Sequence, residues 1–323
     1  MKAEDIINRQ LNWAKRKGIE TVKDFPLKRK GVESVKDYPL YCSSVSKNIF
    51  DGLHENTKEQ FDKADGNELK DGRYPAKMKA LFSSSALCVN LFQYFADGNG
   101  KNDAKELLIA CKLITHECNE QIIIEFEKKF ETGISTPNLD VVIGIGESQL
   151  IAIESKFTEP YSKHDKKKFN FIQEKYGCKK LWRNAGNLFS KLGFDTESIK
   201  TIRYKEKGKE KIIKGWPIFN KYNYLDAAQL IKHILGVTNS LKNNQEEKKT
   251  EETLFYLWYD ALGAEGAMHR EEIEDFRKTI EDATCQKIKV RHATYQEVIA
   301  ALRNNLDYET HKNYINYLTE RYL

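Results

Sequence analysis

The sequence predicts a mixed α/β domain in which a central β-sheet is covered by helices on both faces. Three observations lead to this prediction. Residues 121–157 contain three strand-like runs rich in β-branched and aromatic residues. Two helical patterns precede them, at residues 77–95 and 102–120. Helix and strand patterns alternate after residue 221. This order of elements is typical of domains with helices packed on a sheet.

The element boundaries follow from periodicity and from breakers. Residues 1–75 contain helical pieces interrupted by Gly and Pro, and we expect no strand there. We therefore predict an N-terminal helical extension, residues 1–75, packed on a main domain, residues 76–323. Residues 161–221 are expected to form helices and loops. A helix at 222–236, a strand at 253–260, a helix at 269–283 and a strand at 286–295 follow, and we expect both strands to join the central sheet.

The runs at residues 138–145 and 149–157 flank a Gly-Glu-Ser turn and predict a hairpin. If the turn centres on Glu147, Asp140 lies opposite Glu154, at a Cβ separation of about 4.5–5.5 Å. Lys156 lies two residues beyond Glu154 and so points to the same face. A shift of one residue would separate these side chains. One register therefore gathers two carboxylates and one ammonium group in an apolar hairpin.

Two adjacent carboxylates repel when both are ionised, and a divalent cation relieves this repulsion. Mg²⁺ prefers carboxylate oxygens, water and phosphate oxygens. It can activate water and stabilise charge on a phosphoryl group. The pattern thus predicts phosphodiester hydrolysis with Mg²⁺, or Mn²⁺ as a substitute, as the cofactor. The alternative is a surface ion pair between Glu154 and Lys156 that contributes little.

The sequence Pro137-Asn138-Leu139-Asp140, then thirteen residues, then Glu154-Ser155-Lys156 resembles the PD-(D/E)XK motif of restriction-endonuclease-like nucleases. The proline stands two residues further from the Asp than in the consensus, a common departure. Shared phrases such as IAIESKFTEPY and LFYLWYDALG also resemble an uncharacterised bacterial restriction-endonuclease-like family, over residues 75 to 300. The resemblance implies a restriction-endonuclease-like core. It also implies Asp140 and Glu154 as metal ligands, the Ser155 carbonyl as a further ligand and Lys156 as the catalytic lysine.

Two further residues are candidates for the same site. Many members of that superfamily add an upstream carboxylate, and Glu127 is preferred here to Glu125 or Glu117 because its strand should neighbour Asp140. Gln229 lies on a helix in a polar stripe with Asp226 and His233, and it resembles the downstream Gln motif of RecB-like nucleases. Gln229 is therefore a candidate to position Lys156 or a phosphate. The alternative is an ordinary solvated helix face.

Residues 161–221 carry 17 Lys or Arg against 6 Asp or Glu, although the whole chain has a net charge of only +5. Such an asymmetry favours a polyanionic partner, and we expect DNA. The alternative is a solvated basic surface. The candidate nucleic-acid-binding residues in this basic segment are Lys163, Lys166, Lys167, Lys168, Lys179, Lys180 and Arg183.

The sequence thus favours a Mg²⁺-dependent endodeoxyribonuclease, plausibly a restriction or defence enzyme. A homodimer is expected if it cuts both strands of a duplex. A nuclease for single strands, branched DNA or RNA stays open, as does a non-catalytic nucleic-acid-binding protein of the same fold. No apolar run is long enough for a transmembrane helix and no secretory signal is present, so we expect a cytoplasmic protein. The six cysteines form no CxxC pair, which favours reduced, mostly buried thiols.

Overall fold

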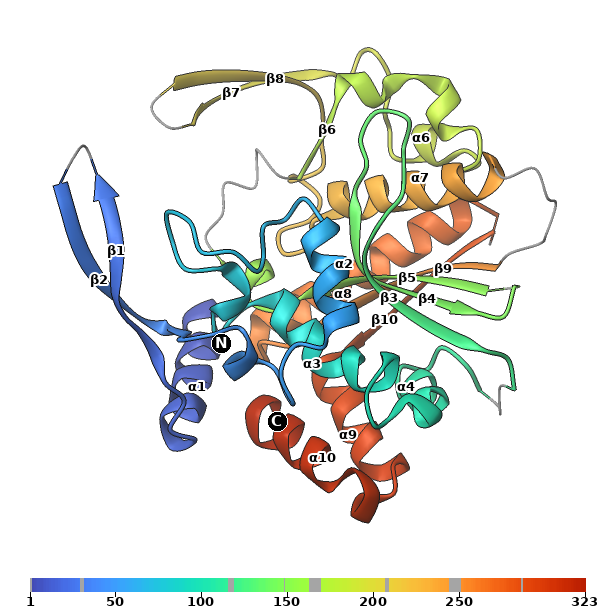
Figure 1. Cartoon of the computed structure of the whole chain (residues 1–323). Coiled ribbons are helices and arrows are strands. Elements are labelled where there is room, and N and C mark those ends of the chain that lie inside the picture. Colours follow the sequence, from blue (N-terminus) through green and yellow to red (C-terminus); the bar gives the residue numbers. More distant parts are fainter. Residues whose placement is uncertain are drawn as a thin grey trace.

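The computed structural model describes residues 2–29, 32–115, 119–147, 149–162, 170–206, 209–243, 251–285 and 287–323. Its centre is a five-stranded sheet with the order β10-β9-β5-β4-β3 (Figure 1). The strands are β3 Ile122–Lys129, β4 Asn138–Ile145, β5 Gln149–Lys156, β9 Glu251–Trp258 and β10 Ile288–Thr294. The predicted mixed α/β architecture is confirmed, and both C-terminal strands join the central sheet.

The sheet contains antiparallel and parallel pairs. β3, β4 and β5 form an antiparallel meander. β9 then runs parallel to β5, and β10 runs parallel to β9. Parallel neighbours require crossover connections, which helices provide. The helices of the described chain are α1 Ala3–Arg16, α2 Glu55–Lys63, α3 Ser84–Ala96, α4 Ala104–Ala110, α6 Leu188–Lys191, α7 Ala227–Asn243, α8 Gly263–Ala283, α9 Tyr295–Asn305 and α10 Tyr308–Tyr322.

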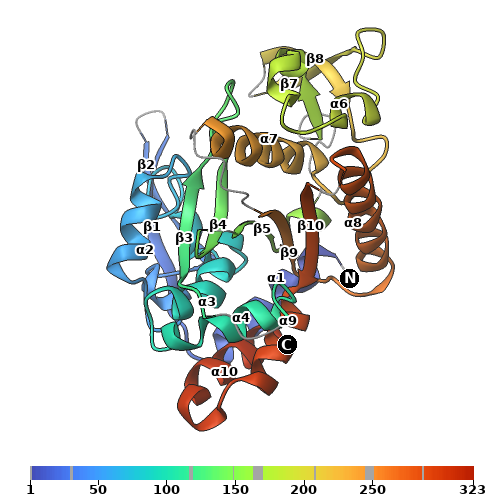
Figure 2. The same ribbon diagram turned by 90° about the vertical axis from the view of Figure 1, so that its right-hand side faces the viewer.

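Alternate residues of the central strands enter two separate apolar cores. Val141 and Ile153 pack in the core formed with α3, α4, α9 and α10. Val142 and Ala152 pack in the core formed with α7 and α8. Figure 2 shows these two groups of helices on opposite sides of the sheet. Because both faces are covered, the central strands are almost continuously apolar, as the sequence indicated.

Two segments contain strands that the sequence did not predict, and the predicted helix at 102–120 is shorter, since α4 ends at Ala110. The N-terminal 75 residues contain an antiparallel ribbon, β1 Thr21–Arg29 and β2 Val32–Cys42. The basic segment 161–221 contains a three-stranded sheet of order β6-β8-β7. Its strands are β6 Phe171–Gln173, β7 Lys200–Glu206 and β8 Lys209–Pro217. Both β1–β2 and β7–β8 project from the body (Figure 1). Few of the side chains whose burial is described in these ribbons are buried, so the ribbons lack the apolar alternation that reveals a half-buried strand.

Arg321 of α10 joins the C-terminal helix to the N-terminal segment. Its side chain is buried, and its Nη1 and Nη2 donate to the carbonyl oxygen and Oδ1 of Asn48, at 2.8 and 2.6 Å. Its Nε donates to Gln10 Oε1 at 3.0 Å. The guanidinium group lies 4.3 Å from the ring centroid of Trp13. The N-terminal extension is thus connected to α10 by a buried hydrogen-bond network.

We expect Arg321→Met to lower the free energy of unfolding by about 3 kcal/mol, because buried acceptors of Asn48 and Gln10 lose their donors. Urea unfolding followed by circular dichroism measures the change. Arg303→Met, at an exposed position of α9, is the matched control. Equal unfolding midpoints for the two variants would contradict a stabilising role for the Arg321 network.

None of the helices in the described residues is long and apolar enough to cross a membrane. Cys42, Cys88 and Cys111 are buried free thiols, as expected, whereas Cys178 and Cys285 are exposed. Cys118 lies outside the described residues.

Candidate active site

The β4–β5 hairpin adopts the predicted register. Val142 pairs with Ala152 and Val141 pairs with Ile153. Asp140 follows at the next position outward, where the ladder ends, and its Oδ2 accepts a hydrogen bond from the Ser155 backbone N–H at 2.7 Å. The carboxylate of Asp140 therefore reaches across the hairpin to the Glu154–Ser155 peptide.

Glu127 of β3 lies on the other side of Asp140. The β3–β4 pairs on either side, Phe126 with Val141 and Lys128 with Leu139, place Glu127 opposite Asp140. Glu127 has a φ of 51°, a left-handed conformation that is costly for a residue with a side chain and interrupts the ladder. Three adjacent strands thus present Glu127, Asp140 and Glu154 side by side.

The geometry favours Glu127 over Glu125 as the third carboxylate. Oε2 of Glu127 accepts a hydrogen bond from Asn138 Nδ2 at 3.2 Å. Glu125 instead pairs at the surface with Lys128, with a side chain 42% exposed. Glu117, the other candidate, lies outside the described residues.

Helix α7 packs on the sheet and contacts Glu154 and Lys156. Lys156 Nζ donates to Glu154 Oε1 at 2.5 Å and to Gln229 Oε1 at 2.9 Å. His233, one turn beyond Gln229, places Nε2 2.8 Å from Glu154 Oε2. This second contact is close but poorly directed, so neither atom completes a hydrogen bond. The side chains of Glu154 and His233 are 2% and 1% exposed, so the solvated-face interpretation is wrong for this stripe.

The stripe begins at Asp226, just before α7. Its Oδ1 accepts a hydrogen bond from the Gln229 backbone N–H at 2.9 Å, which caps the helix. The cap fixes the first turn, from which Gln229 reaches Lys156. Residues 226, 229 and 233 share one helix face because they lie three and seven positions apart. The sequence shows this spacing but does not indicate a role for His233, which contacts Glu154 directly.

The pKa values of the three carboxylates are driven apart by burial and by their neighbours. Burial and the negative charges of Glu154 and Glu127 raise the pKa of Asp140 well above its usual value. Burial, with Glu68 and Glu154, raises the pKa of Glu127 to about 7. Burial alone would also raise the pKa of Glu154, but Lys156 and His233 outweigh it and lower that pKa to about 2. Without another cation, the cluster does not keep all three carboxylates ionised at neutral pH.

Lys156 balances the charge of Glu154. Burial opposes its protonation, yet Glu154 and Asp140 outweigh burial and raise the pKa of its ammonium group. Lys156 is therefore a cation in this arrangement. No group of three or more His, Cys, Asp or Glu side chains in the described ranges is arranged to hold a metal ion by itself. A smaller set is present: Asp140 and Glu154 supply carboxylate oxygens and Ser155 a backbone carbonyl between them, a donor set that suits Mg²⁺ with water completing its coordination.

We expect Glu127→Gln to stabilise the protein in EDTA at pH 8, but not at pH 5. An unfolded glutamate titrates near 4.5, whereas folded Glu127 titrates at about 7. Between these values the folded state binds more protons, so stability falls as the pH rises, and above pH 7 the whole penalty is present. Allowing for partial exposure, the gain at pH 8 is about 2 kcal/mol.

Urea unfolding at both pH values tests this prediction. Glu125→Gln, two residues away on the same strand, is the matched control and should show no comparable gain. A Glu127→Gln gain that is the same at pH 5 and pH 8 would contradict the assigned pKa.

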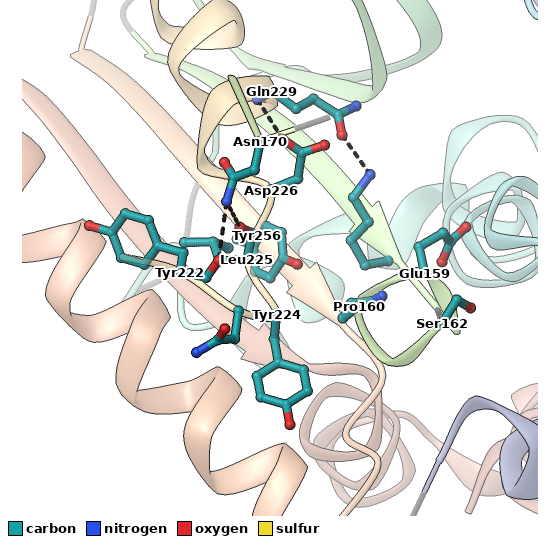
Figure 3. A pocket seen from close by; sticks show the side chains of 12 residues that line it. Glu159, Pro160, Ser162, Asn170, Tyr222, Tyr224, Leu225, Asp226, Gln229 and Tyr256 are labelled. Carbon is teal, nitrogen blue, oxygen red and sulfur yellow. Dashed lines mark hydrogen bonds between the residues drawn. The ribbon is translucent and has the colours of Figure 1, made fainter. Parts of the chain in front are cut away.

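A pocket of about 240 Å³ adjoins Lys156, and Asp140 is not part of its lining. Figure 3 shows Asp226 and Gln229 at one end, Pro160 and Glu159 along one side and Tyr222 and Tyr224 on the others. Tyr256, the partner of Glu154 in the β5–β9 ladder, forms part of the wall. The sequence did not indicate this pocket, because its walls come from four separate segments.

The candidate nucleic-acid-binding residues are only partly described. Lys163, Lys166, Lys167 and Lys168 lie outside the described residues. Lys179, Lys180 and Arg183 are exposed. The nearby Leu181 carbonyl accepts a hydrogen bond from Asn239 on α7. Asn239 lies ten residues beyond Gln229, or about 15 Å along the helix. These three cations therefore lie toward the far end of α7 and not in the carboxylate cluster.

The five-stranded mixed sheet, covered on both faces and carrying its polar cluster on one meander, defines a restriction-endonuclease-like α/β protein. The model of a family described as restriction endonuclease associating with ARP matches residues 8–323, and the chain belongs to this family. Membership of this family indicates a nuclease. No curated protein and no solved structure gives a significant match to the chain.

Proposed function

We propose that the protein is a metal-dependent endonuclease of the PD-(D/E)XK type that hydrolyses DNA phosphodiester bonds in restriction or defence. The observation that carries the proposal is the position of Asp140, Glu154 and Lys156 on one face of one hairpin, with Lys156 bonded to both Glu154 and Gln229. A surface ion pair would need neither the burial of Glu154 nor the contact with α7.

Mg²⁺, or Mn²⁺ in its place, would be held by Asp140, Glu154 and the Ser155 carbonyl. When bound, such an ion supplies an activated water and stabilises charge on the phosphoryl oxygens. The raised pKa values of Asp140 and Glu127 support a cationic ligand, because a divalent ion would allow the adjacent carboxylates to ionise together.

The other residues of the site have distinct roles in this proposal. Lys156, as an ammonium group, orients the attacking water and offsets negative charge on the phosphate. Gln229 accepts a hydrogen bond from Lys156 and orients its side chain, and His233 lies against the other carboxylate oxygen of Glu154. Glu127, opposite Asp140 on β3, is positioned to accept a proton from a water molecule once a bound cation lets its carboxyl group ionise.

The test is incubation of the protein with unmethylated plasmid, single-stranded DNA and RNA in Mg²⁺, Mn²⁺ or EDTA. If discrete plasmid fragments form only in the presence of metal, the protein is a duplex endonuclease. A homodimer would then bring one site to each strand. If the protein cuts only single-stranded DNA or only RNA in the presence of metal, that nucleic acid is its substrate. Binding without cleavage under either metal would contradict the proposal and favour a non-catalytic binding protein.

We expect Gln229→Ala to lower kcat about tenfold to a hundredfold, because Lys156 loses the acceptor that orients it. Loss of a residue that orients a catalytic group typically has an effect of this size. Single-turnover cleavage measures the change. Gln149→Ala, which removes an amide from the opposite end of β5, is the control and should leave kcat unchanged. Equal rates for Gln229→Ala and wild type would remove Gln229 from the site.

A further inference from the structure

We propose that the pocket beside Lys156 binds one unpaired nucleobase of the nucleic-acid strand. The pocket is lined by aromatic and apolar side chains together with hydrogen-bonding groups. Figure 3 shows Tyr222, Tyr224 and Tyr256 around it, with Asp226, Gln229 and Glu159 at its polar parts. The inference rests on the proposed function in one respect, namely that Lys156 marks the position of the backbone phosphate.

The charges around the pocket favour a base over a phosphate in its interior. Among the described residues that line the pocket, Lys156 is the one cation, whereas Glu159 and Asp226 contribute carboxyl groups. A phosphate inside would be repelled by ionised carboxylates, whereas the amino group of a base can donate to them. A strand with its phosphate at Lys156 can therefore direct a neighbouring base away from the carboxylate cluster and into the pocket.

The size of the pocket fits a single base. Its volume of about 240 Å³ lies below the roughly 300–1,000 Å³ of pockets for drug-sized ligands. A base stacked and paired in a duplex cannot enter such a recess, so the nucleotide must come from a single strand or be turned out of the helix. Aromatic walls stack equally well with different bases, which suits binding without sequence preference.

The wall that carries Tyr224 is held rigidly before any ligand arrives. The Glu272 carboxylate on α8 accepts hydrogen bonds from three successive backbone N–H groups, those of residues 223, 224 and 225, at 2.5, 2.7 and 2.9 Å. From the other side, Asn170 Nδ2 donates to the carbonyls of Tyr222 and Leu225 at 3.3 and 3.0 Å. A preformed wall lowers the entropy lost when a ligand binds.

The test measures binding in EDTA, so that cleavage plays no part. The probes are a fluorescein-labelled oligodeoxycytidylate of about twelve nucleotides and an abasic strand of equal length. Wild type should bind the cytosine strand about tenfold more tightly than the abasic strand, the effect of stacking one base on an aromatic side chain. Tyr224→Ala should lose about tenfold in affinity for the cytosine strand and less than about twofold for the abasic strand.

Two control variants distinguish loss of the Tyr224 ring from a general effect on the fold. Tyr224→Phe keeps the ring and should bind both strands as wild type does. Tyr308→Ala removes an exposed tyrosine from α10 and should also be unchanged. Equal wild-type affinity for the two strands would overturn the pocket proposal even if Tyr224→Ala does not fold. An equal loss on both strands, or none on either, would overturn it as well.

The binding result is independent of the cleavage result. If wild type cleaves DNA with metal but binds the two strands equally, only the pocket proposal fails. If it prefers the cytosine strand but never cleaves, the pocket proposal stands and the proposed nuclease function fails.

Discussion

Lys156→Ala should reduce metal-dependent DNA cleavage by about a thousandfold or more while changing the dissociation constant for DNA by less than about threefold. The reason is that Lys156 contributes one charge at the reacting phosphate, whereas the basic segment carries many. A single-turnover cleavage assay and fluorescence anisotropy in EDTA measure the two quantities separately.

This variant also breaks a buried ion pair, because Glu154 is 2% exposed and keeps only the His233 contact. A loss of several kcal/mol of stability is expected from an uncompensated charge. Thermal unfolding must therefore show that the variant is folded at the assay temperature. Lys312→Ala, at an exposed site on α10 on the opposite side of the sheet, is the matched control. Cleavage by Lys156→Ala at the wild-type rate would remove this lysine from the mechanism.

Asp140→Asn should reduce cleavage by a comparable factor and also weaken Mn²⁺ binding by at least about tenfold. The substitution removes the negative charge but keeps an oxygen that can accept from the Ser155 N–H. Because burial and two neighbouring carboxylates raise the pKa of Asp140, a neutral amide should be tolerated or even stabilising without metal. Reduced activity with unchanged or higher stability is the combination that identifies a functional carboxylate.

Titration calorimetry measures the affinity for Mn²⁺, and urea unfolding in EDTA measures the stability without metal. Asp307→Asn, at the exposed cap of α10, is the control for the chemical change. If Asp140→Asn keeps wild-type affinity for Mn²⁺ and full cleavage, the proposed metal site is wrong. If it loses activity only because it unfolds, the urea measurement shows this directly.

Together these variants separate the roles within the cluster. Loss of Lys156 should leave metal binding largely intact, whereas loss of Asp140 should not. Gln229→Ala should affect the rate alone, and Glu127→Gln should show the pH-dependent gain in stability. A merely structural polar cluster would instead lose stability in every case, since each variant would remove a stabilising contact.

The sequence by itself determined the central hairpin and the register that brings its three candidate site residues together. Side chains alternate between the two faces of a strand, so only one register of this apolar strand pair buries the apolar side chains. That register places Asp140 beside Glu154. It also predicted a helix in this region, although the predicted bounds of 222–236 differ from those of α7, Ala227–Asn243, and it placed Gln229 and His233 on one helix face. These features depend on residues only a few positions apart, so local patterns are sufficient to find them.

The tertiary structure alone decided what covers the hairpin. Gln229 meets Lys156 across 73 positions of sequence because α7 packs on one core of the sheet. The pocket exists because Glu272 and Asn170 hold the 222–225 segment in place. The ribbons β1–β2 and β7–β8 were not predicted for a related reason. Few of their described side chains are buried, and burial is what imposes a periodic pattern on a sequence. Packing between distant segments depends on the whole chain, so it cannot be predicted from a local sequence pattern.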